Sequence, residues 1–393
     1  MASPLEGRRL WIAGIGGAGM SAYALLARAW GAEVRGWDRT RTPYLEHLGG
    51  IDVEISGEPP EPPEGWEPVV STAFAERIRG RSRADLLAEL VSLRESIVVA
   101  GAHGKTTTSG MIAFCLDRLG RDPAWLIGGD IPQLGGNAGT GQGWLVVEGD
   151  ESDRTIAALR PTIAVVTNVE LDHHATFGSR AELVDLFERW LDVVPQVIRG
   201  EQLEPYDGPL ALAGEHNRMN AACALAALEL VGIRREEAGP VLARFGGASR
   251  RLERRGEVGG VEVYDDYGHH PTEIAATLAA MRNGGRLLVL FQPHLYSRTR
   301  HLARELAAAL TQADLVAVAN VYPAREEPIE GVTGKLVVEA LSELRPGMPV
   351  AWTPAVDDGA RFLAAHTRRG DRVLTIGAGD VDRAAGLLLE TLG

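Results

Sequence analysis

The residues most clearly arranged for chemistry lie in the segment IVVAGAHGKTTTSGM, residues 97–111. An apolar, β-branched run ends at Gly101, and a turn leads through Gly104 and Lys105 into a helix-favouring stretch, so the segment predicts strand, glycine turn and helix. Such a turn points backbone N–H groups at a helix N-terminus, where the helix dipole favours an anion. Lys105 adds a positive charge and Thr106 a hydroxyl ligand for Mg²⁺. The segment predicts a phosphate-binding turn, although Gly101 and Gly104 stand closer together than the strict P-loop pattern requires.

The use of lysine supports this interpretation. The chain contains two lysines, Lys105 and Lys335, and arginine carries almost all of its basic charge. A compact ammonium group can reach between phosphate oxygens where a guanidinium cannot. We therefore interpret Lys105 as a phosphate-binding residue, in preference to an ordinary βα turn.

Acidic and imidazole side chains follow two further apolar runs. Residues 144–147 lead into Glu148, and residues 162–167 lead into a segment that ends with Asp172 and His173. Ligands bind at the carboxyl edge of an open parallel sheet, and Mg²⁺ prefers one or two carboxylates. By hardness alone, Glu148 and Asp172 are the first candidates for a metal site. The alternative is that some of these acidic residues only cap helices.

A second glycine turn lies near the start of the chain. An apolar strand at 10–13 leads into GIGGAG and a helix at 20–30, and Asp38 follows at the distance expected in dinucleotide-binding units. The glycines of this turn are Gly14, Gly16, Gly17 and Gly19. A dehydrogenase remains open at this point, because the same turn can hold any diphosphate on a helix N-terminus.

Further polar residues follow in the second half of the chain. Asn217 and Asn220 lie three apart, so on a helix they share a face and can bind one planar group. The strand at 261–264 ends in DDYGHHPTE, a density of polar groups that folding alone does not require, and the strand at 286–291 leads to QPHLYSRTR. The alternative for the arginines in QPHLYSRTR is that they lie at the solvent-exposed start of a helix and take no part in a site.

Strands and helices alternate along the whole chain, which predicts an α/β protein with parallel or mostly parallel sheets. At 393 residues it is too long for one ordinary core, and we expect three consecutive domains at 1–95, 96–247 and 248–393. We predict a surface excursion at 51–68, a glycine-rich loop at 128–143 and a linker at 245–256.

Composition narrows the class of protein. The hydrophobic content of 45% and charged content of 24% are typical of a soluble globular protein, and a net charge of −13 argues against nucleic-acid binding. The two cysteines lie far apart in apolar surroundings, so we expect buried thiols with neither a disulfide nor a metal site. We see no signal peptide or membrane span and expect a cytoplasmic protein with no membrane partner.

Nine motifs, in order, resemble the Mur ligase family: GIGGAGMSA, GAHGKTTTS, EGDESD, NVELDH, GEHNRMNA, ASRRL, DDYGHHPTEI, FQPHLYSRT and IGAGDV. The resemblance implies three α/β domains: a Rossmann-like domain for a UDP-sugar, a P-loop-like domain for ATP and a Rossmann-like domain for an amino acid. It implies ATP-dependent amide formation between L-alanine and the lactoyl carboxylate of UDP-N-acetylmuramate, through an acyl phosphate, in peptidoglycan precursor synthesis. The expected partners are these small molecules, and we expect a monomer or weak homodimer.

The resemblance also assigns roles to residues. It makes Glu148 and His173, with Thr106, the metal ligands, so that His173 replaces Asp172, and Mn²⁺ is expected to substitute for Mg²⁺. The residues expected to bind ATP are Gly101, His103, Gly104, Lys105, Thr106, Thr107, Asn217, Asn220, Arg251, Asp266 and Tyr267. Lys105, Glu148, His173, Arg251 and Asp266 form the expected catalytic set. Gly14, Gly16, Gly17, Gly19 and Asp38 would bind the UDP diphosphate, and His269 and Arg298 would face the amino acid.

The chain departs from the family pattern in three ways. It is shorter at the end of the first domain and around 196–212. Leu295 stands where some members have an arginine near the amino acid. Sister ligases use a carboxylated lysine after the metal histidine, whereas no lysine lies between His173 and Arg251. The acceptor therefore stays open between L-alanine and another amine or peptide, as in tripeptide recycling.

Overall fold

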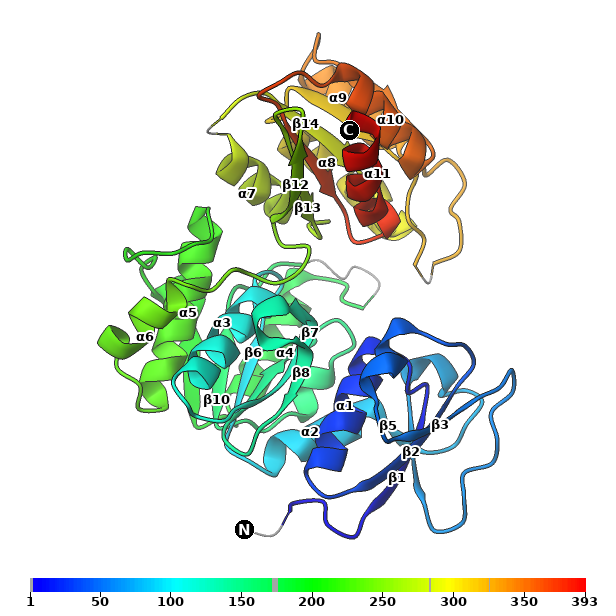
Figure 1. The fold of residues 1–393 in the computed structure, drawn as a ribbon, viewed down its shortest axis with the longest axis vertical. Coiled ribbons are helices and arrows are strands. Elements are labelled where there is room, and N and C mark those ends of the chain that lie inside the picture. Colours follow the sequence, from blue (N-terminus) through cyan, green and yellow to red (C-terminus); the bar gives the residue numbers. More distant parts are fainter. Residues whose placement is uncertain (1–2, 172–175, 283, 325) are drawn as a thin grey trace. The chain divides into compact units, whose positions relative to one another are not determined.

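The computed structural model describes residues 3–171, 176–282, 284–324 and 326–393. The described residues form three β-sheets, each with helices packed against it (Figure 1). They group into two compact units. The first contains 3–170, 180–211 and 218–246, and the second contains 171, 176–179, 212–217 and the chain from 247 onward.

The first sheet is parallel, with the strand order β3-β2-β1-β4-β5. Its strands are β1 (Arg9–Ala13), β2 (Glu33–Asp38), β3 (Asp52–Ile55), β4 (Glu67–Val70) and β5 (Arg81–Ser82), and its helices are α1 (Ala18–Ala29) and α2 (Arg83–Ser92). The predicted surface excursion at 51–68 is wrong at both ends, because β3 and the start of β4 lie within it. Both strands are short and partly exposed, which leaves little apolar signal in the sequence.

The second sheet has the strand order β11-β10-β6-β9-β7-β8. Its strands are β6 (Ser96–Ala100), β7 (Ala124–Ile131), β8 (Gly136–Thr140), β9 (Leu145–Glu148), β10 (Ile163–Val166) and β11 (Gln196–Arg199). The helices nearby in the chain are α3 (Lys105–Arg118), α4 (Arg180–Leu191), α5 (Glu215–Leu230) and α6 (Arg235–Leu242). Among the described strands of this sheet, β7 and β8 form the antiparallel pair and the other pairs are parallel.

The β7–β8 hairpin corrects the predicted glycine-rich loop at 128–143. A Cβ atom at Gly139 would lie 2.2 Å from the ring of Trp125, so glycine in β8 makes room for the large side chain of β7. The hairpin also meets the first sheet's helix α1, because the Asn137 side-chain amide donates to the Ala18 carbonyl at 3.3 Å. The first two sheets therefore belong to one compact unit, and the domain boundary at residue 95 stays a prediction.

The third sheet has the strand order β12-β13-β17-β14-β15-β16. Its strands are β12 (Glu253–Val258), β13 (Val261–Asp266), β14 (Leu287–Phe291), β15 (Leu315–Val318), β16 (Val350–Trp352) and β17 (Arg372–Ile376). Its helices are α7 (Pro271–Met281), α8 (Tyr296–Leu310), α9 (Lys335–Leu344), α10 (Val356–His366) and α11 (Arg383–Leu392). The predicted linker at 245–256 is wrong in its last part, because β12 pairs antiparallel with β13.

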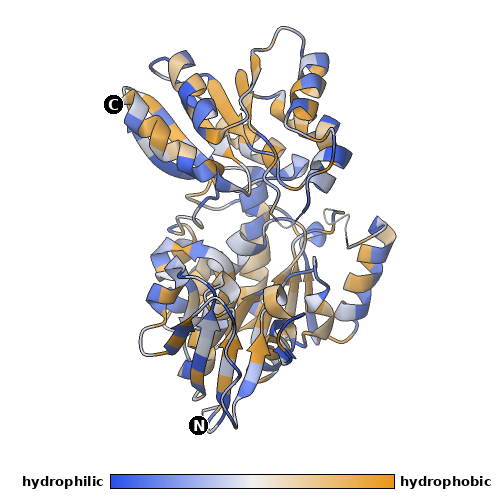
Figure 2. Cartoon of the chain, turned by 90° about the vertical axis from the view of Figure 1, so that its right-hand side faces the viewer, coloured by the Kyte–Doolittle hydropathy of each residue, from blue (hydrophilic) through white to orange (hydrophobic). Residues whose placement is uncertain are grey.

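Alternate residues of β14 enter opposite cores of the third sheet. Leu287, Val289 and Phe291 pack in the core that includes residues of α7, α8 and α9, whereas Leu288 and Leu290 pack with residues of α10 and α11. Figure 2 shows apolar colour along the strands and on the helix sides turned toward them. A strand buried on both faces carries a continuous apolar run, which is why the sequence predicted it correctly.

Two simpler expectations can be compared with the structure. Cys115 and Cys223 are buried and unpaired, as predicted. Among the described residues, no helix combines the length and the apolar character needed to cross a membrane.

Candidate functional site

The turn between β6 and α3 depends on two glycines in left-handed backbone conformations. Gly101 has φ +131° and Gly104 has φ +81°. A Cβ atom at Gly101 would lie 2.3 Å from the Thr167 hydroxyl, and one at Gly104 would lie 2.2 Å from the Asn220 side-chain oxygen. Both the backbone angle and the space exclude a side chain, so the glycines predicted here are required by the geometry.

The residues that brace this turn follow strand β10. Asn168 accepts from the His103 N–H at 3.0 Å and donates to the His103 carbonyl at 2.9 Å, and the Thr167 hydroxyl donates to the same carbonyl at 2.6 Å. The Nε2 atom of His103 lies 3.2 Å from a carboxylate oxygen of Glu170. We did not predict Thr167 and Asn168 as site residues, although Asn168 begins the NVELDH motif.

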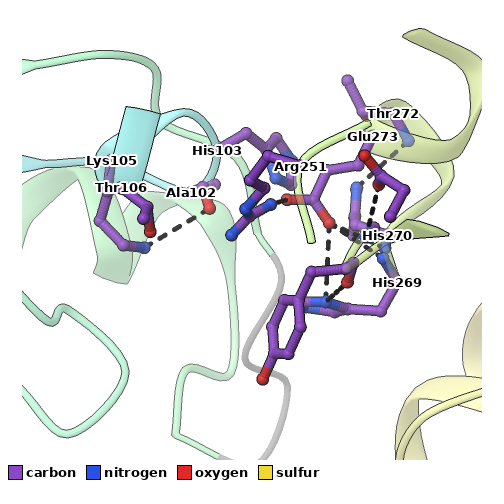
Figure 3. A network of polar contacts seen from close by, with 12 residues as sticks. Ala102, His103, Lys105, Thr106, Arg251, His269, His270, Thr272 and Glu273 are labelled. Atoms are coloured by element: carbon purple, nitrogen blue, oxygen red, sulfur yellow. Dashed lines mark hydrogen bonds and ion pairs between the residues drawn. The ribbon is translucent and has the colours of Figure 1, made fainter. Parts of the chain in front are cut away.

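Lys105 begins helix α3, and its ammonium group lies beneath the turn. Nζ donates to the Gly101 carbonyl at 2.6 Å and lies 2.9 Å and 3.1 Å from the two carboxylate oxygens of Glu151. A longer contact of 3.5 Å to the Ala102 carbonyl is drawn in Figure 3. Glu151 is 1% exposed and the Lys105 side chain is 16% exposed, so the ion pair is largely shielded from solvent.

Burial acts against both charges of this pair. It alone would lower the pKa of Lys105, but the carboxylates of Glu151 and Glu148 outweigh it and the pKa is raised. Burial raises the pKa of Glu151, and Lys105 opposes that shift. Lys105 is thus held as a cation at the predicted phosphate-binding turn. We did not predict Glu151, because EGDESD offers several acidic residues and spacing does not tell which one reaches the lysine.

Thr106 and Glu148 bring two oxygen donors together beside the turn. The Thr106 hydroxyl donates to a Glu148 carboxylate oxygen at 2.9 Å, and the Gly128 N–H donates to the same oxygen at 2.7 Å. A hydroxyl and a carboxylate are hard ligands that fit Mg²⁺. The third predicted ligand, His173, lies outside the described residues. Thr107, also predicted, is buried in the first turn of α3.

The two asparagines of helix α5 are both buried. Asn220 lies against Gly104, as described above, while the Asn217 side-chain amide donates to the Ala213 carbonyl at 2.7 Å. The structure therefore brings Asn220 against the predicted phosphate-binding turn. It gives Asn217 a role in fixing the start of α5.

The glycine turn between β1 and α1 is closed by Asp38. One carboxylate oxygen of Asp38 accepts from the Gly16 N–H at 2.7 Å, and the Thr42 hydroxyl donates to the Gly16 carbonyl at 2.7 Å. Gly14 has φ +80°, and Gly17 precedes helix α1. A Cβ atom at Gly19 would lie 3.8 Å from the Arg83 guanidinium, which forms a 2.9 Å ion pair with Asp153. Arg83 is a charged neighbour of this turn that sequence reasoning missed.

In the second unit, Asp266 ties together two segments of backbone. One of its oxygens accepts from the Leu252 N–H and the other from the Gly268 N–H, each at 2.7 Å. Burial raises the pKa of Asp266 to about 6, while Arg251 and the bond from Gly268 act in the opposite direction.

Arg251 and Tyr267 lie beside Asp266. The Arg251 guanidinium is 5.3 Å from the centre of the Tyr267 ring and 3.5 Å from the Glu273 carboxylate, and Figure 3 shows this ion pair. The structure therefore brings three of the predicted ATP-binding residues, Arg251, Asp266 and Tyr267, into one cluster.

His269 and Arg298 meet through a residue that we did not single out, His294. The rings of His269 and His294 are 5.6 Å apart, and Arg298 Nη1 lies 3.0 Å from Nδ1 of His294. His294 also stacks on Tyr322, with an angle of 12° between the rings. Arg298 is 3% exposed, so its charge lies inside this aromatic cluster.

Leu295 occupies a strained position in the same cluster. It precedes helix α8 with φ +69° and ψ 132°, a conformation that residues with a side chain rarely adopt. Its N–H donates to the Tyr322 carbonyl at 2.9 Å, and its carbonyl accepts from the Thr299 hydroxyl at 2.8 Å. Backbone strain of this kind is concentrated at functional sites, where the surrounding bonds maintain it.

Comparisons with known proteins identify the family of the chain. The Mur ligase middle domain matches residues 99–195, and the Mur ligase glutamate ligase domain matches residues 250–379. The UDP-N-acetylmuramate–L-alanine ligases of Renibacterium salmoninarum and Kineococcus radiotolerans are 37% and 39% identical to this chain, each over 98% of its length and 96% of theirs. The chain belongs to the Mur ligase family.

A solved structure shows the same fold. The UDP-N-acetylmuramate–alanine ligase from Thermotoga maritima matches with a TM-score of 0.79 and 24% identity, over 97% of this chain and 98% of that chain. The alignment with the Renibacterium protein runs over 451 positions, more than the 393 residues of this chain. That relative therefore carries residues with no counterpart here, while their positions at the end of the first domain and around 196–212 stay a prediction.

Proposed function

We propose that the chain joins L-alanine to UDP-N-acetylmuramate in peptidoglycan precursor synthesis, with ATP as the source of energy. The observation that carries this proposal is the buried Lys105–Glu151 pair, which holds a cation at a phosphate-binding turn beside Thr106 and Glu148. The names of the relatives at 37% and 39% identity supply the substrates.

The reaction balances without a protein nucleophile. The lactoyl carboxylate attacks the γ-phosphorus of ATP and becomes an acyl phosphate, while the bond to the β-phosphate oxygen breaks and ADP leaves. The amine of L-alanine then attacks the acyl carbon, the new C–N bond replaces the C–O bond to phosphate, and phosphate and a proton leave. Catalysis of this kind depends on positioning and on stabilising the charge of the transferring group.

We assign the nucleotide phosphates to the turn between β6 and α3, where Lys105 supplies a fixed positive charge. The backbone and side chains of Gly101, His103, Gly104, Thr106 and Thr107 complete this site. Thr106 and Glu148 would hold Mg²⁺, with His173 as the further ligand implied by the family. When bound, the cation would neutralise phosphate charge, and Mn²⁺ is expected to replace it.

The remaining assignments follow the clusters described above. Asn217, Asn220, Arg251, Asp266 and Tyr267 would bind the rest of ATP. The turn of Gly14, Gly16, Gly17 and Gly19, closed by Asp38, would receive the UDP diphosphate. The buried guanidinium of Arg298, linked to His269 through His294, offers a partner for the carboxylate of L-alanine.

Three wider statements belong to the same proposal. We keep three domains at 1–95, 96–247 and 248–393, since each range contains one sheet. A reaction that consumes ATP and a nucleotide sugar suits the cytoplasm. We expect a monomer or weak homodimer, and gel filtration with light scattering measures this.

The decisive experiment measures phosphate release by purified protein with ATP, Mg²⁺ and UDP-N-acetylmuramate. The acceptors are L-alanine, glycine, L-serine, D-glutamate and a tripeptide, each also tested without the sugar nucleotide. We expect release that requires both L-alanine and the sugar nucleotide. Release with the tripeptide instead would identify a recycling ligase, and no release with any acceptor would contradict the proposal.

A further inference from the structure

Arg250 makes an unusual set of contacts for a residue next to a proposed ATP-binding arginine. Its Nε donates to the Asp265 carboxylate at 2.9 Å, Nη2 donates to the Gly377 carbonyl at 2.8 Å, and Nη1 donates to the Gly379 carbonyl at 3.1 Å. Asp265 lies in β13, and the two glycines follow the neighbouring strand β17. One planar guanidinium thus joins the carboxyl ends of two adjacent strands.

The carboxylate partner of Arg250 is fixed in turn. Asp265 is 0% exposed, and its other oxygen accepts from the Thr375 hydroxyl at 2.5 Å. Burial raises the pKa of Asp265, while Thr375 and Arg250 oppose the shift. A buried carboxylate of this kind needs its cation, so the position of the Arg250 side chain is strongly determined.

The backbone of Arg250 is held in a left-handed conformation. It has φ +58°, and Leu252 two residues later has φ +50°. The Arg250 N–H donates to Glu253 at 2.8 Å, and its carbonyl accepts from the Tyr267 N–H at 2.6 Å. Non-glycine residues keep such angles only where surrounding bonds impose them. The linker at 250–252 therefore has one defined path.

The guanidinium groups of Arg250 and Arg251 both lie over the ring of Tyr267. The guanidinium carbon of Arg250 lies 5.1 Å from the ring centre and that of Arg251 lies 5.3 Å from it. Both distances are within the range of cation–π attraction. The orientation of Tyr267 and the path of Arg251 thus depend on the anchor that Arg250 provides.

We propose that Arg250 is a positioning residue, which sets the Tyr267 ring and the Arg251 side chain for the nucleotide while making no contact with it. The inference rests on the proposed function, because it uses the assignment of Tyr267 and Arg251 to ATP. It predicts an effect on nucleotide affinity that a purely structural arginine would not have.

The test compares Arg250→Lys with Arg286→Lys in the full chain. Arg286 is a matched control, since it holds the buried Asp371 through two bonds of 3.1 Å and 2.6 Å and donates to the His366 carbonyl at 3.0 Å, before β14 and away from Tyr267. Lysine keeps a positive charge opposite the carboxylate, but its ammonium group cannot make all the hydrogen bonds that the planar guanidinium makes. We expect both variants to lower Tm similarly.

Nucleotide binding separates the two variants. With a non-hydrolysable ATP analogue and Mg²⁺, Arg250→Lys should raise Kd about tenfold and KM for ATP in parallel, with kcat at saturating ATP within about twofold of wild type. Arg286→Lys should leave Kd within twofold. Equal losses of Tm with an unchanged Kd in Arg250→Lys would overturn the inference.

Two further variants keep the outcome clear. Asp265→Asn weakens the contact that holds the Arg250 guanidinium while leaving Arg250 itself unchanged. It should also raise Kd for the ATP analogue, so the inference can be tested even if Arg250→Lys fails to fold. Tyr267→Leu tests the underlying assignment. If Tyr267→Leu raises Kd while Arg250→Lys and Asp265→Asn leave it unchanged, the role proposed for Arg250 is wrong but the assignment of Tyr267 to ATP stands. If Tyr267→Leu leaves Kd unchanged, the assignment of Tyr267 to ATP is wrong, and the role proposed for Arg250 is wrong as well.

Discussion

At the scale of single residues, the site depends on a partly buried lysine that is paired with a fully buried carboxylate. Glu151 lies within 2.9 Å of Lys105, and neither charge would be stable there alone. The pair keeps the ammonium group ionised and fixed before any nucleotide arrives. We therefore expect the two partners to contribute differently, Lys105 to the proposed phosphate binding and Glu151 to the position and charge of Lys105.

The two lysines of the chain allow a matched test of this division. Lys105→Met should abolish ligation, by about 10³-fold or more, and lower the free energy of unfolding by about 3–5 kcal/mol, because Glu151 loses its buried cation. Lys335→Met, on the exposed start of α9, should leave ligation unchanged and lower the free energy of unfolding by about 1 kcal/mol or less, because it loses the contact of its ammonium group with the Trp352 ring at 4.2 Å. The double variant Lys105→Met with Glu151→Gln should recover stability in urea unfolding but no activity. Recovery of activity would show that Lys105 is dispensable.

A second residue-scale prediction concerns the close approach at Gly104. Gly104→Ala and Gly120→Ala both place a side chain at positive φ, +81° and +70°, and the backbone angle alone should cost each about 1–2 kcal/mol of unfolding free energy, to which Gly104→Ala adds the cost of its steric clash. Gly120 faces open space, whereas a Cβ at Gly104 meets Asn220. Gly104→Ala alone should therefore weaken nucleotide binding, at least tenfold by calorimetry. Equal nucleotide affinities in the two variants would contradict this.

Sequence reasoning found the residues whose role is local and missed those whose role depends on the fold. Gly104, Lys105 and Thr106 are adjacent, so their chemistry can be predicted from spacing. Glu151 and Asn168 reach the same turn from other strand ends, and several neighbouring polar residues in each motif were equal candidates. His173, predicted from the family, lies outside the described residues.

At the scale of elements, the segment from β13 to α7 is organised by Asp266. Its two oxygens each accept a backbone N–H, one from the linker at Leu252 and one from the loop at Gly268. The ionised carboxylate accepts both bonds, and protonation replaces one acceptor with an O–H donor. Nucleotide binding and stability should therefore respond to pH in opposite directions.

The sign of the effect on stability follows from the raised pKa. Between about pH 4 and 6 the folded protein keeps a proton that the unfolded chain has released, so the contribution of Asp266 is full below pH 4 and is lost as pH rises through 6. The loss is about 3 kcal/mol, relative to Asp266→Asn, in urea unfolding from pH 4 to pH 7. Affinity for the ATP analogue should instead fall as pH drops below 6. If the free energy of unfolding and the nucleotide affinity each depend on pH in the same way in wild type and in Asp266→Asn, this prediction is wrong.

The elements that were predicted wrongly share a physical cause. The β7–β8 hairpin was taken for a loop because glycine is depleted in strands, and only the contact of Gly139 with Trp125 explains its presence there. Strand β12 (ERRGEV) is charged because it lies at the edge of the third sheet. The buried strands β6, β9, β10 and β14 were predicted correctly because their apolar runs are continuous.

At the scale of the whole molecule, the net charge of −13 must act on substrates that are themselves anions. The long-range field should repel ATP and the UDP-sugar, while Lys105 and its neighbours attract them at short range. Raising the salt concentration from about 20 to 150 mM screens the long-range part first. We therefore expect the KM of both nucleotides to fall about twofold, with the KM of zwitterionic L-alanine unchanged as the internal control. A rise in the nucleotide KM values would show that local attraction dominates.

The order along the chain of the segments that form the two compact units has a consequence for folding during synthesis. Residues 212–217 belong to the second unit but precede residues 218–246 of the first. During synthesis they leave the ribosome before most of the chain they pack with, including Glu273, which lies near His216 in the finished structure. The second unit thus completes its fold only after translation reaches β17, and a gene fragment that starts at 248 encodes it without this piece.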